Sequence, residues 1–256
     1  MKMATWNLNS IRSREERLLK WLHRQQPDVV CLQELKVTED KFPFEPLREV
    51  GYHASVHGQK TYNGVAILSR TEPKDVKVSF DDGVDDPQSR IVSATIDAVR
   101  VLSVYVPNGA SVGSEKWEYK LEWFERLRLY LDRNLDPKTS VALCGDFNIA
   151  PDDQDAANPE VWSDSVLCHE EGRQALRNVS DWGLVDAFRL KHPEGGIYSW
   201  WDYRRLAFPK NDGLRIDHIF VTESLSKRVV SAEVDRQERK GKLPSDHAPV
   251  IVEISD

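Results

Sequence analysis

Short apolar runs alternate with amphipathic stretches along the whole chain, and this alternation limits the folds open to it. Some runs are apolar throughout, as at Val29, Val30, Cys31 and Leu32, which is typical of strands buried on both faces. The runs predict strands at residues 2–6, 28–32, 64–69, 91–96, 99–106, 140–144, 216–221 and 248–254. Since strands occupy both halves of the chain and helices intervene irregularly, the pattern indicates one α/β domain over residues 1–256, with about ten strands.

Helical periodicity is clear in two stretches and weaker in a third. Residues 13–25 carry apolar side chains on one face. Residues 115–134 repeat apolar side chains at steps of three and four, and Ser114 is placed to cap the N-terminus of that helix. A third helix is expected near residues 170–182. The apolar faces of these helices are predicted to pack on the core.

Composition and charge narrow the class of protein. With 40% hydrophobic and 30% charged residues, the chain has the composition of a folded globular domain. No run approaches the ~20 apolar residues of a membrane span, and the N-terminus lacks a signal-peptide pattern, so no membrane partner is expected. Three widely spaced cysteines (Cys31, Cys144 and Cys168) favour a reducing cytoplasm over a disulfide framework or a thiolate zinc site. The net charge of −7 argues against a uniformly basic nucleic-acid binder.

Polar side chains recur where the predicted strands begin or end. They are Asn7, Glu34, Tyr105, Asp146, Asn148, Asp217, Asp246 and His247. Strand ends are where α/β folds place ligand chemistry. Carboxylate and amide oxygens without a thiolate suit Mg²⁺ or Mn²⁺, and a histidine beside carboxylates can serve as an imidazolium or as a general acid or base. Together these residue types predict metal-assisted attack of water on a phosphate ester.

Six short motifs occur in a consistent order over nearly the whole chain. They are Thr5-Trp6-Asn7-Leu8-Asn9, Cys31-Leu32-Gln33-Glu34-Leu35-Lys36, Tyr105-Val106-Pro107-Asn108-Gly109, Gly145-Asp146-Phe147-Asn148-Ile149-Ala150-Pro151, Leu214-Arg215-Ile216-Asp217 and Ser245-Asp246-His247-Ala248-Pro249. Each motif alone is a weak signal, but the ordered set is specific. The chain resembles the exonuclease III-type AP endonucleases of the endonuclease/exonuclease/phosphatase superfamily. The resemblance implies a four-layer α/β sandwich, in which helices flank two packed mixed β-sheets.

The resemblance also implies a metal site and its neighbours. Glu34 is expected to be the principal metal ligand, with Asn7 beside it and Asp246 as an outer or second-metal ligand. The expected ion is Mg²⁺ or Mn²⁺. Asn9 stands where some relatives have aspartate, so one anion fewer is expected near the metal. Asn9 and Asn108 are both expected to contact the substrate.

The catalytic roles implied by the resemblance fall on five residues. Asp146 is expected to position or deprotonate the attacking water, or to protonate the leaving oxygen. Asn148 is expected to orient phosphate or water, and Tyr105 to hydrogen-bond the scissile phosphate. His247, paired with Asp217, is expected to stabilise negative charge that develops on the phosphate oxygens.

The aromatic stretch at residues 198–204, which ends at Arg204, resembles the DNA-repair branch of the superfamily. The resemblance implies that Trp200, Trp201, Leu214 and Ile216 form a small apolar pocket for an extruded, base-free sugar. An abasic site costs little to extrude because no base pair is lost. Arg204 is expected to contact the DNA. Basic residues near the candidate site are expected to touch phosphates; they include Arg205, Lys210, Arg215, Arg236, Arg239, Lys240 and Lys242.

These expectations describe a monomeric, Mg²⁺- or Mn²⁺-dependent DNA-repair phosphodiesterase. It is expected to cleave double-stranded DNA 5′ to an abasic site, leaving a 3′-hydroxyl, and to trim 3′ ends as an exonuclease. One alternative is a superfamily phosphatase that acts on a nucleotide, a phosphoinositide or a lipid head group. A second alternative, a non-catalytic DNA-binding paralogue, is disfavoured because the candidate catalytic residues are all present. The acidic chain predicts DNA binding that is modest and salt-sensitive.

Overall fold

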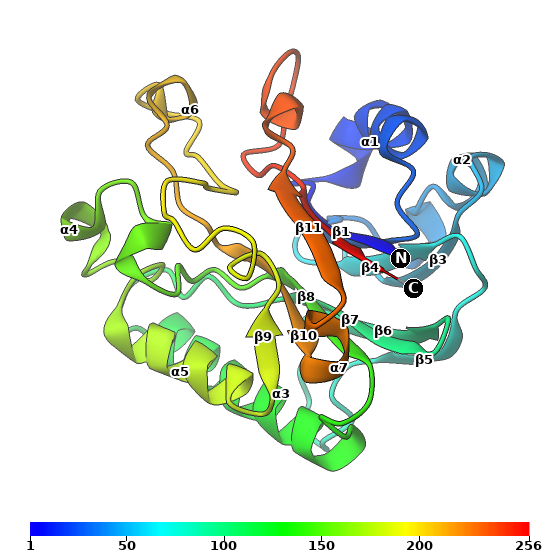
Figure 1. Cartoon of the computed structure of the whole chain (residues 1–256), viewed down its shortest axis with the longest axis horizontal. Coiled ribbons are helices and arrows are strands. Elements are labelled where there is room, and N and C mark those ends of the chain that lie inside the picture. The colour runs from blue at the N-terminus through cyan, green and yellow to red at the C-terminus, as the bar shows by residue number, and fades with distance from the viewer. Residues whose placement is uncertain (256) are drawn as a thin grey trace.

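Two six-stranded β-sheets pack face to face in the computed structural model, which describes residues 1–255 (Figure 1). The first sheet has the order β11-β12-β1-β2-β4-β3, and the second has the order β5-β6-β7-β8-β10-β9. Each sheet is mixed, because β1 and β2 are parallel in the first and β7 and β8 are parallel in the second, whereas the other neighbours are antiparallel. The four-layer α/β sandwich is therefore confirmed.

The first sheet contains strands from both the N-terminal and the C-terminal parts of the chain, and the second contains strands from its middle, as their residue ranges show. The first sheet contains β1 (Lys2–Asn7), β2 (Val29–Gln33), β3 (His53–His57), β4 (Val65–Ser69), β11 (Val229–Val234) and β12 (Val250–Ile254). The second contains β5 (Lys74–Val78), β6 (Ile91–Ile96), β7 (Val99–Tyr105), β8 (Val141–Asp146), β9 (Leu184–Asp186) and β10 (Asp217–Thr222). The helices are α1 (Ile11–Gln25), α2 (Phe44–Glu49), α3 (Glu115–Asn134), α4 (Pro159–Trp162), α5 (Glu170–Ser180), α6 (Ala207–Lys210) and α7 (Glu223–Ser226), with 3-10 turns η1 (Glu39–Lys41), η2 (Asp153–Asp155) and η3 (Arg236–Arg239).

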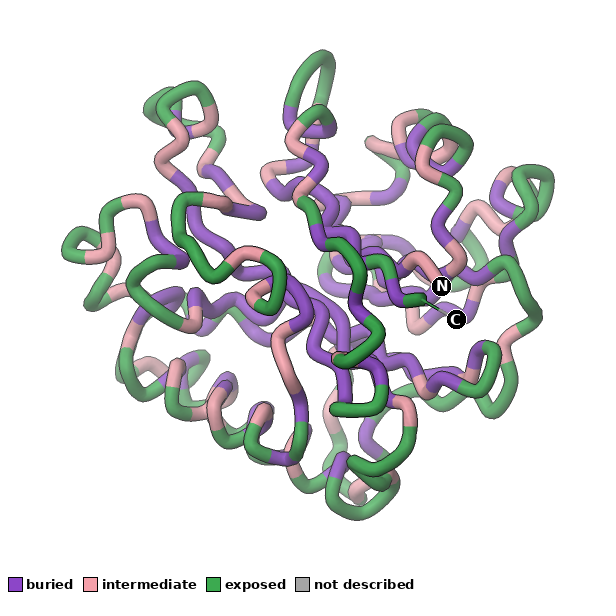
Figure 2. The backbone as a smooth tube through the Cα atoms, viewed as in Figure 1, coloured by how far each residue is buried: buried purple, intermediate pink, exposed green. Residues whose placement is uncertain are grey.

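Three apolar layers hold the sandwich together. Between the sheets, Val29 and Cys31 of β2 pack with Ala142 of β8 in one buried cluster. On the outer faces, α1 covers the first sheet and α3 and α5 cover the second, each through its apolar stripe. Figure 1 shows α1 and α2 on one side of the molecule and α3 and α5 on the other. In Figure 2 the sheets are mostly buried and the outer turns of the helices are exposed.

The predicted helices and their signals agree with the structure. α3 spans the predicted residues 115–134, and the Ser114 hydroxyl accepts a hydrogen bond from the backbone N–H of Trp117 at 3.2 Å. α1 begins at Ile11, one half-turn before the predicted start, and α5 ends at Ser180. Within residues 1–255, no helix combines the length and hydropathy that crossing a membrane requires.

Eight predicted strands are present, and four more were not predicted. The additional strands are β3, β5, β9 and β11, which form the outer edges of the two sheets. Edge strands have one side without a partner strand and carry fewer buried residues, so their sequences lack the continuous apolar runs of the inner strands. β5 is the extreme case, because all its residues are exposed.

Candidate active site

The strand topology brings the predicted polar residues to one end of both sheets. β1 and β2 are parallel, so Asn7 at the end of β1 lies beside the residues that follow β2. In the second sheet, Asp146 pairs in register with Tyr105 of β7 on one side and with Asp217 of β10 on the other. β10 runs antiparallel to β8, which explains why Asp217 starts its strand while Asp146 ends one. The candidate site is therefore built where the two sheets meet.

Asn7 links the carboxylates of the two sheets. Its Nδ2 donates to Oε1 of Glu34 at 2.9 Å and to Oδ2 of Asp146 at 2.9 Å, while its Oδ1 accepts from the backbone N–H of Asn9 at 2.9 Å. Asn7 is completely buried, so these bonds fix its orientation. In this arrangement its side chain presents a donor to both carboxylates; its predicted role as a metal ligand remains a prediction.

The carboxylate of Glu34 is surrounded by hydrogen-bond donors. Its Oε1 also accepts from the Tyr105 hydroxyl at 3.0 Å, and its Oε2 pairs with the Lys36 ammonium at 2.8 Å. Burial and the neighbouring negative charge of Glu34 raise the pKa of Tyr105 well above its usual value, so the phenol stays a proton donor. Glu34 has a left-handed backbone (φ 51°), a conformation that non-glycine residues adopt rarely.

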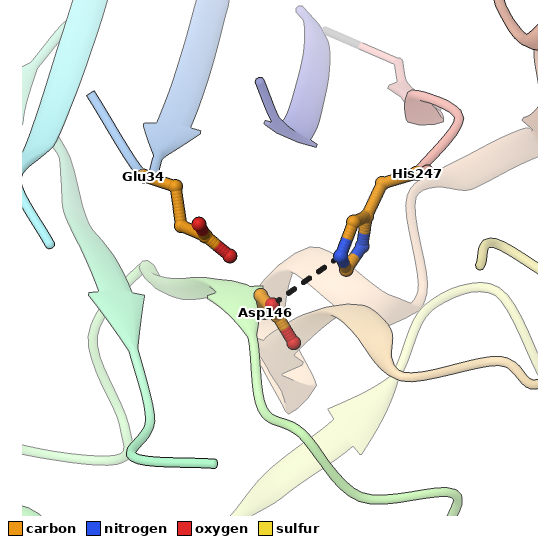
Figure 3. A group of neighbouring side chains, drawn as sticks. All are labelled: Glu34, Asp146 and His247. Carbon is orange, nitrogen blue, oxygen red and sulfur yellow. Dashed lines mark ion pairs between the residues drawn. The ribbon is translucent and has the colours of Figure 1, made fainter. Parts of the chain in front are cut away.

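The carboxylates of this site fit a divalent metal ion. Ligand atoms of Glu34, Asp146 and His247 all lie within 4.8 Å of one another (Figure 3). The two carboxylates supply the oxygen ligands that hard cations prefer. Asp246, which was predicted as an outer ligand, is not in this group. Its carboxylate accepts instead from Nδ2 of Asn9 at 3.0 Å and from Nε1 of Trp200 at 3.1 Å.

A buried acid–base chain runs from Asp217 through His247 to Asp146. Nδ1 of His247 donates to Oδ2 of Asp217 at 2.8 Å, and its Nε2 lies 3.7 Å from Oδ2 of Asp146. The Ser199 hydroxyl donates to Asp217 at 2.6 Å and holds that carboxylate in place. Burial opposes the charged imidazolium, but the two carboxylates raise the pKa of His247 to about 10. His247 is therefore a cation at neutral pH.

Asp146 differs from an ordinary aspartate in its affinity for a proton. Burial and the nearby charge of Asp217 raise the pKa of Asp146 to about 7, although the His247 cation opposes the shift. Its Oδ1 accepts the backbone N–H of Asn148 at 2.9 Å. Because its pKa is close to neutral, Asp146 can accept or donate a proton at neutral pH.

Two asparagines form a second pair beside Asp146. Nδ2 of Asn108 donates to Oδ1 of Asn148 at 3.1 Å, and Nδ2 of Asn148 donates to the Val106 carbonyl at 2.9 Å. Asn148, like Glu34, has a left-handed backbone (φ 50°), and it lies two residues after the end of β8. Asn108 is exposed, so its amide is open to a ligand.

The four predicted pocket residues separate into two groups. Leu214 and Ile216 belong to one buried cluster, and the half-buried Trp200 packs against it. Trp200 also bridges through its backbone to both Leu214 and His247. Trp201 is completely buried in another cluster, with Tyr198, Ala207 and Ala248. The structure therefore groups Trp200 with Leu214 and Ile216, bridges its backbone to His247, and places Trp201 in a separate cluster.

Several basic residues near the site are interior rather than exposed. Arg215 is 1% exposed and Arg239 is 6% exposed, so neither guanidinium is available for the phosphate contacts expected of them. Arg239 donates to the Ser245 carbonyl at 2.7 Å and lies over the ring of Phe208. Arg204, in contrast, has an 83% exposed side chain that is paired with Asp202.

Lys120 is a residue near the site that the sequence analysis did not identify. It is completely buried on α3, and its ammonium donates to the carbonyls of Asn148 at 2.8 Å, Asn108 at 3.1 Å and Val166 at 2.7 Å. Burial lowers the pKa of Lys120 to about 7. The available signal was a lysine three residues after Trp117, on the apolar face of a strongly periodic helix.

His218 lies on the opposite side of β10 from the acid–base chain. Its Nδ1 accepts from Nη1 of Arg215 at 3.0 Å, so its Nε2 carries the proton and donates to the Ile149 carbonyl at 2.9 Å. Burial, together with the Arg215 charge, lowers the pKa of His218 to about 4. His218 is therefore neutral, and it braces the loop that follows Asp146.

This pKa predicts an acid-labile contribution to stability. Between pH 6.5 and 4 the unfolded chain binds a proton at residue 218 that the folded chain does not, so the contribution falls as the pH falls, by at most about 3 kcal/mol. Urea unfolding of the wild type and of His218→Gln between pH 7 and 4.5 measures the difference. The wild type is expected to lose more stability across this range than the variant does. Parallel pH profiles would contradict the assignment of a neutral His218.

Comparison with known proteins finds similarity over the whole chain. The sequence profile of the Endonuclease/Exonuclease/phosphatase family matches residues 4–247. Exodeoxyribonuclease III from Haemophilus influenzae is 36% identical over 265 aligned residues, which cover 99% of each chain. An AP endonuclease from Archaeoglobus fulgidus superposes with a TM-score of 0.97 at 38% identity and covers 100% of both chains. A 3′ phosphatase from Neisseria, bound to a product DNA hairpin, superposes with a TM-score of 0.96 at 43% identity, covering 100% of this chain and 99% of that one.

Proposed function

Because the chain belongs to the Endonuclease/Exonuclease/phosphatase family, we propose that it is a metal-dependent DNA-repair phosphodiesterase with one domain over residues 1–256, acting as a monomer. It hydrolyses the DNA backbone 5′ to an abasic site and trims 3′ ends as an exonuclease. The observation that carries the proposal is the cluster of polar residues where the ends of the two sheets meet. There the amide of Asn7 hydrogen-bonds Glu34 and Asp146, beside the His247–Asp217 pair. Relatives named exodeoxyribonuclease III and AP endonuclease support it.

The ion in this proposal is Mg²⁺ or Mn²⁺. Glu34 is its principal protein ligand, with Asn7 beside it and Asp246 in an outer position. Such an ion, when bound, neutralises phosphate charge and polarises the phosphorus–oxygen bonds. Lys36 supports Glu34 from the other side, because its ammonium also donates to Oδ1 of Asn9 at 2.6 Å and so cannot turn away freely.

The acid–base work in this proposal belongs to Asp146. With a pKa of about 7, it can take a proton from the attacking water or return one to the leaving oxygen. The His247 cation, held by Asp217, stabilises negative charge on a phosphate oxygen, since it is already oriented and charged before the substrate arrives. Tyr105 and Asn148 are proposed as hydrogen-bond donors to the same phosphate.

The substrate pocket in this proposal is formed by Trp200, Leu214 and Ile216. Two observations support this assignment: Trp200 packs against the buried cluster that contains Leu214 and Ile216, and its backbone bridges to His247. In this proposal the apolar side chains accept a sugar without a base and exclude an intact nucleotide by size. The proposed DNA contacts at the rim are Asn9, Asn108 and Arg204.

The proposal is tested with a duplex that carries one tetrahydrofuran abasic analogue. The protein is expected to nick this duplex 5′ to the analogue with Mg²⁺ or Mn²⁺ and to leave it intact with EDTA. An undamaged duplex of the same sequence is the control for the endonuclease, and its labelled 3′ end reports exonuclease activity. Absence of a metal-dependent nick would contradict the proposal, and hydrolysis of inositol phosphates in its place would favour the phosphatase alternative.

A 3′ phosphatase activity is a second candidate on the same site. The solved relative from Neisseria with a product DNA hairpin is named for that activity. A duplex with a 3′-phosphate end, assayed beside the tetrahydrofuran duplex, separates the two activities. Release of inorganic phosphate without nicking would make the 3′ phosphatase the main function.

A further inference from the structure

Arg215 lies in the sequence between Leu214 and Ile216 of the proposed pocket, but its side chain contacts a different set of residues. It is almost completely buried, in contrast to most arginines. Its Nε donates to Oδ1 of Asp155 at 2.6 Å, and its Nη1 donates to Oδ2 of Asp186 at 2.7 Å and to Nδ1 of His218 at 3.0 Å. One guanidinium thus joins two carboxylates and an imidazole, none of which takes part in the proposed chemistry.

The partners of Arg215 belong to segments on both sides of the pocket. Asp155 ends η2, and its backbone carbonyl accepts the Arg215 N–H at 2.8 Å. Asp186 ends β9 at the edge of the second sheet. His218 in turn donates a hydrogen bond to the Ile149 carbonyl, in the loop that follows Asp146. Arg215 therefore connects these three segments, and Arg189 adds a second link between two of them, because its guanidinium pairs with Asp155 and its backbone N–H donates to Oδ1 of Asp186 at 3.2 Å.

The pocket residues depend on the same short segment for their positions. Leu214 and Trp200 exchange two backbone hydrogen bonds, with lengths of 3.0 and 2.9 Å. The Ile216 carbonyl accepts the N–H of Phe147 at 2.9 Å, directly after Asp146. Any shift of residues 214–216 is consequently transmitted both to the pocket and to the loop that carries Asp146.

We propose that Arg215 is a positioning residue that sets the shape of the sugar pocket and thereby the preference for a base-free sugar over an intact nucleotide. The inference rests on the proposed function and adds to it a determinant of specificity. The planar fork of arginine satisfies several acceptors at fixed angles, which a lysine ammonium cannot do. A displacement of about 1 Å in a substrate-positioning group can cost roughly 100-fold in rate.

Arg215→Lys tests the proposal, because it keeps the charge and loses the fork. The measurement is kcat/KM for nicking the tetrahydrofuran duplex, divided by kcat/KM for removing the 3′ nucleotide of an undamaged duplex. We expect this ratio to fall about tenfold or more, since a shift of the loop that carries Asp146 lowers both rates, whereas a shift of the pocket wall lowers only the nicking rate. Thermal unfolding of each variant shows whether a change follows from lost stability alone.

Arg126→Lys is the matched control. Arg126 is 8% exposed and also joins two carboxylates, with Nε 2.7 Å from Asp82 and Nη1 2.8 Å from Asp86. Within residues 1–255 the side-chain hydrogen bonds of Arg126 go to these two residues alone, so they reach none of the pocket residues. The ratio is expected to stay unchanged in this variant, whatever its loss of stability.

Asp186→Asn decides the question if Arg215→Lys does not fold. It removes one charge from the network, while the pair between Arg215 and Asp155 remains. The same fall in the ratio, though smaller, is expected. Equal losses on both substrates in the folded variant would overturn the proposal and leave Arg215 a purely structural residue. A wild type that does not nick the tetrahydrofuran duplex would instead remove the proposed function, and this inference with it.

Discussion

Asp146→Asn is expected to lower the single-turnover rate of abasic-site nicking by about 1,000-fold, within the range for loss of a general acid–base group. Asparagine keeps the size of the side chain and an oxygen that can accept from Nδ2 of Asn7. It cannot take or give the proton that the pKa of about 7 makes available in Asp146. Because the change also removes a negative charge that faces the phosphate, DNA binding is expected to persist.

Two measurements separate chemistry from binding for this variant. Single-turnover rates with saturating Mg²⁺ report the chemical step, and fluorescence anisotropy with labelled duplex in EDTA reports binding. Asp97→Asn is the control, because Asp97 is exposed in the turn before β7, at the opposite end of that strand from Tyr105. If the rate of Asp146→Asn stayed within about tenfold of the wild type, Asp146 would not be the general acid or base.

The inner strands could be predicted from the sequence and the outer ones could not. β2 is buried on both faces and therefore appears as a continuous apolar run. β5 has no buried residue, and β9 has only three residues, so neither leaves a pattern that distinguishes it from a loop. These strands exist because the sheet offers them a partner edge, which is a tertiary effect.

The part of the candidate site that could be predicted is the set of polar residues at strand ends, because the position of a residue at the end of a strand places it at one edge of the sheet. Polar residues at strand ends were expected to converge, and Asn7, Glu34 and Asp146 lie within hydrogen-bond reach through one amide. The periodicity of apolar residues in the sequence does not show which groups will surround a polar side chain that lies on an apolar face. Lys120 and Arg215 are both buried, because carbonyls or carboxylates from distant segments surround them.

Glu34→Gln is expected to raise the Mg²⁺ concentration for half-maximal nicking by at least about tenfold, because even supporting residues of metal sites cost 10–100-fold in affinity. Glutamine keeps the shape of the side chain and an acceptor for the Tyr105 hydroxyl, but it lacks the anionic charge that a hard cation needs. It also leaves the Lys36 ammonium without its anionic partner, so a positive charge stays close to the ion. Both effects weaken the binding of a cation without opening the fold.

The measurement is the initial nicking rate across a Mg²⁺ titration, repeated with Mn²⁺. Glu45→Gln is the control, since Glu45 is exposed on α2 and pairs only with Arg48 among residues 1–255. Its titration is expected to match the wild type. Asp246→Asn is expected to shift the midpoint less than Glu34→Gln, because Asp246 lies outside the group formed by Glu34, Asp146 and His247. A Glu34→Gln curve that overlays the wild type would remove Glu34 from the set of metal ligands.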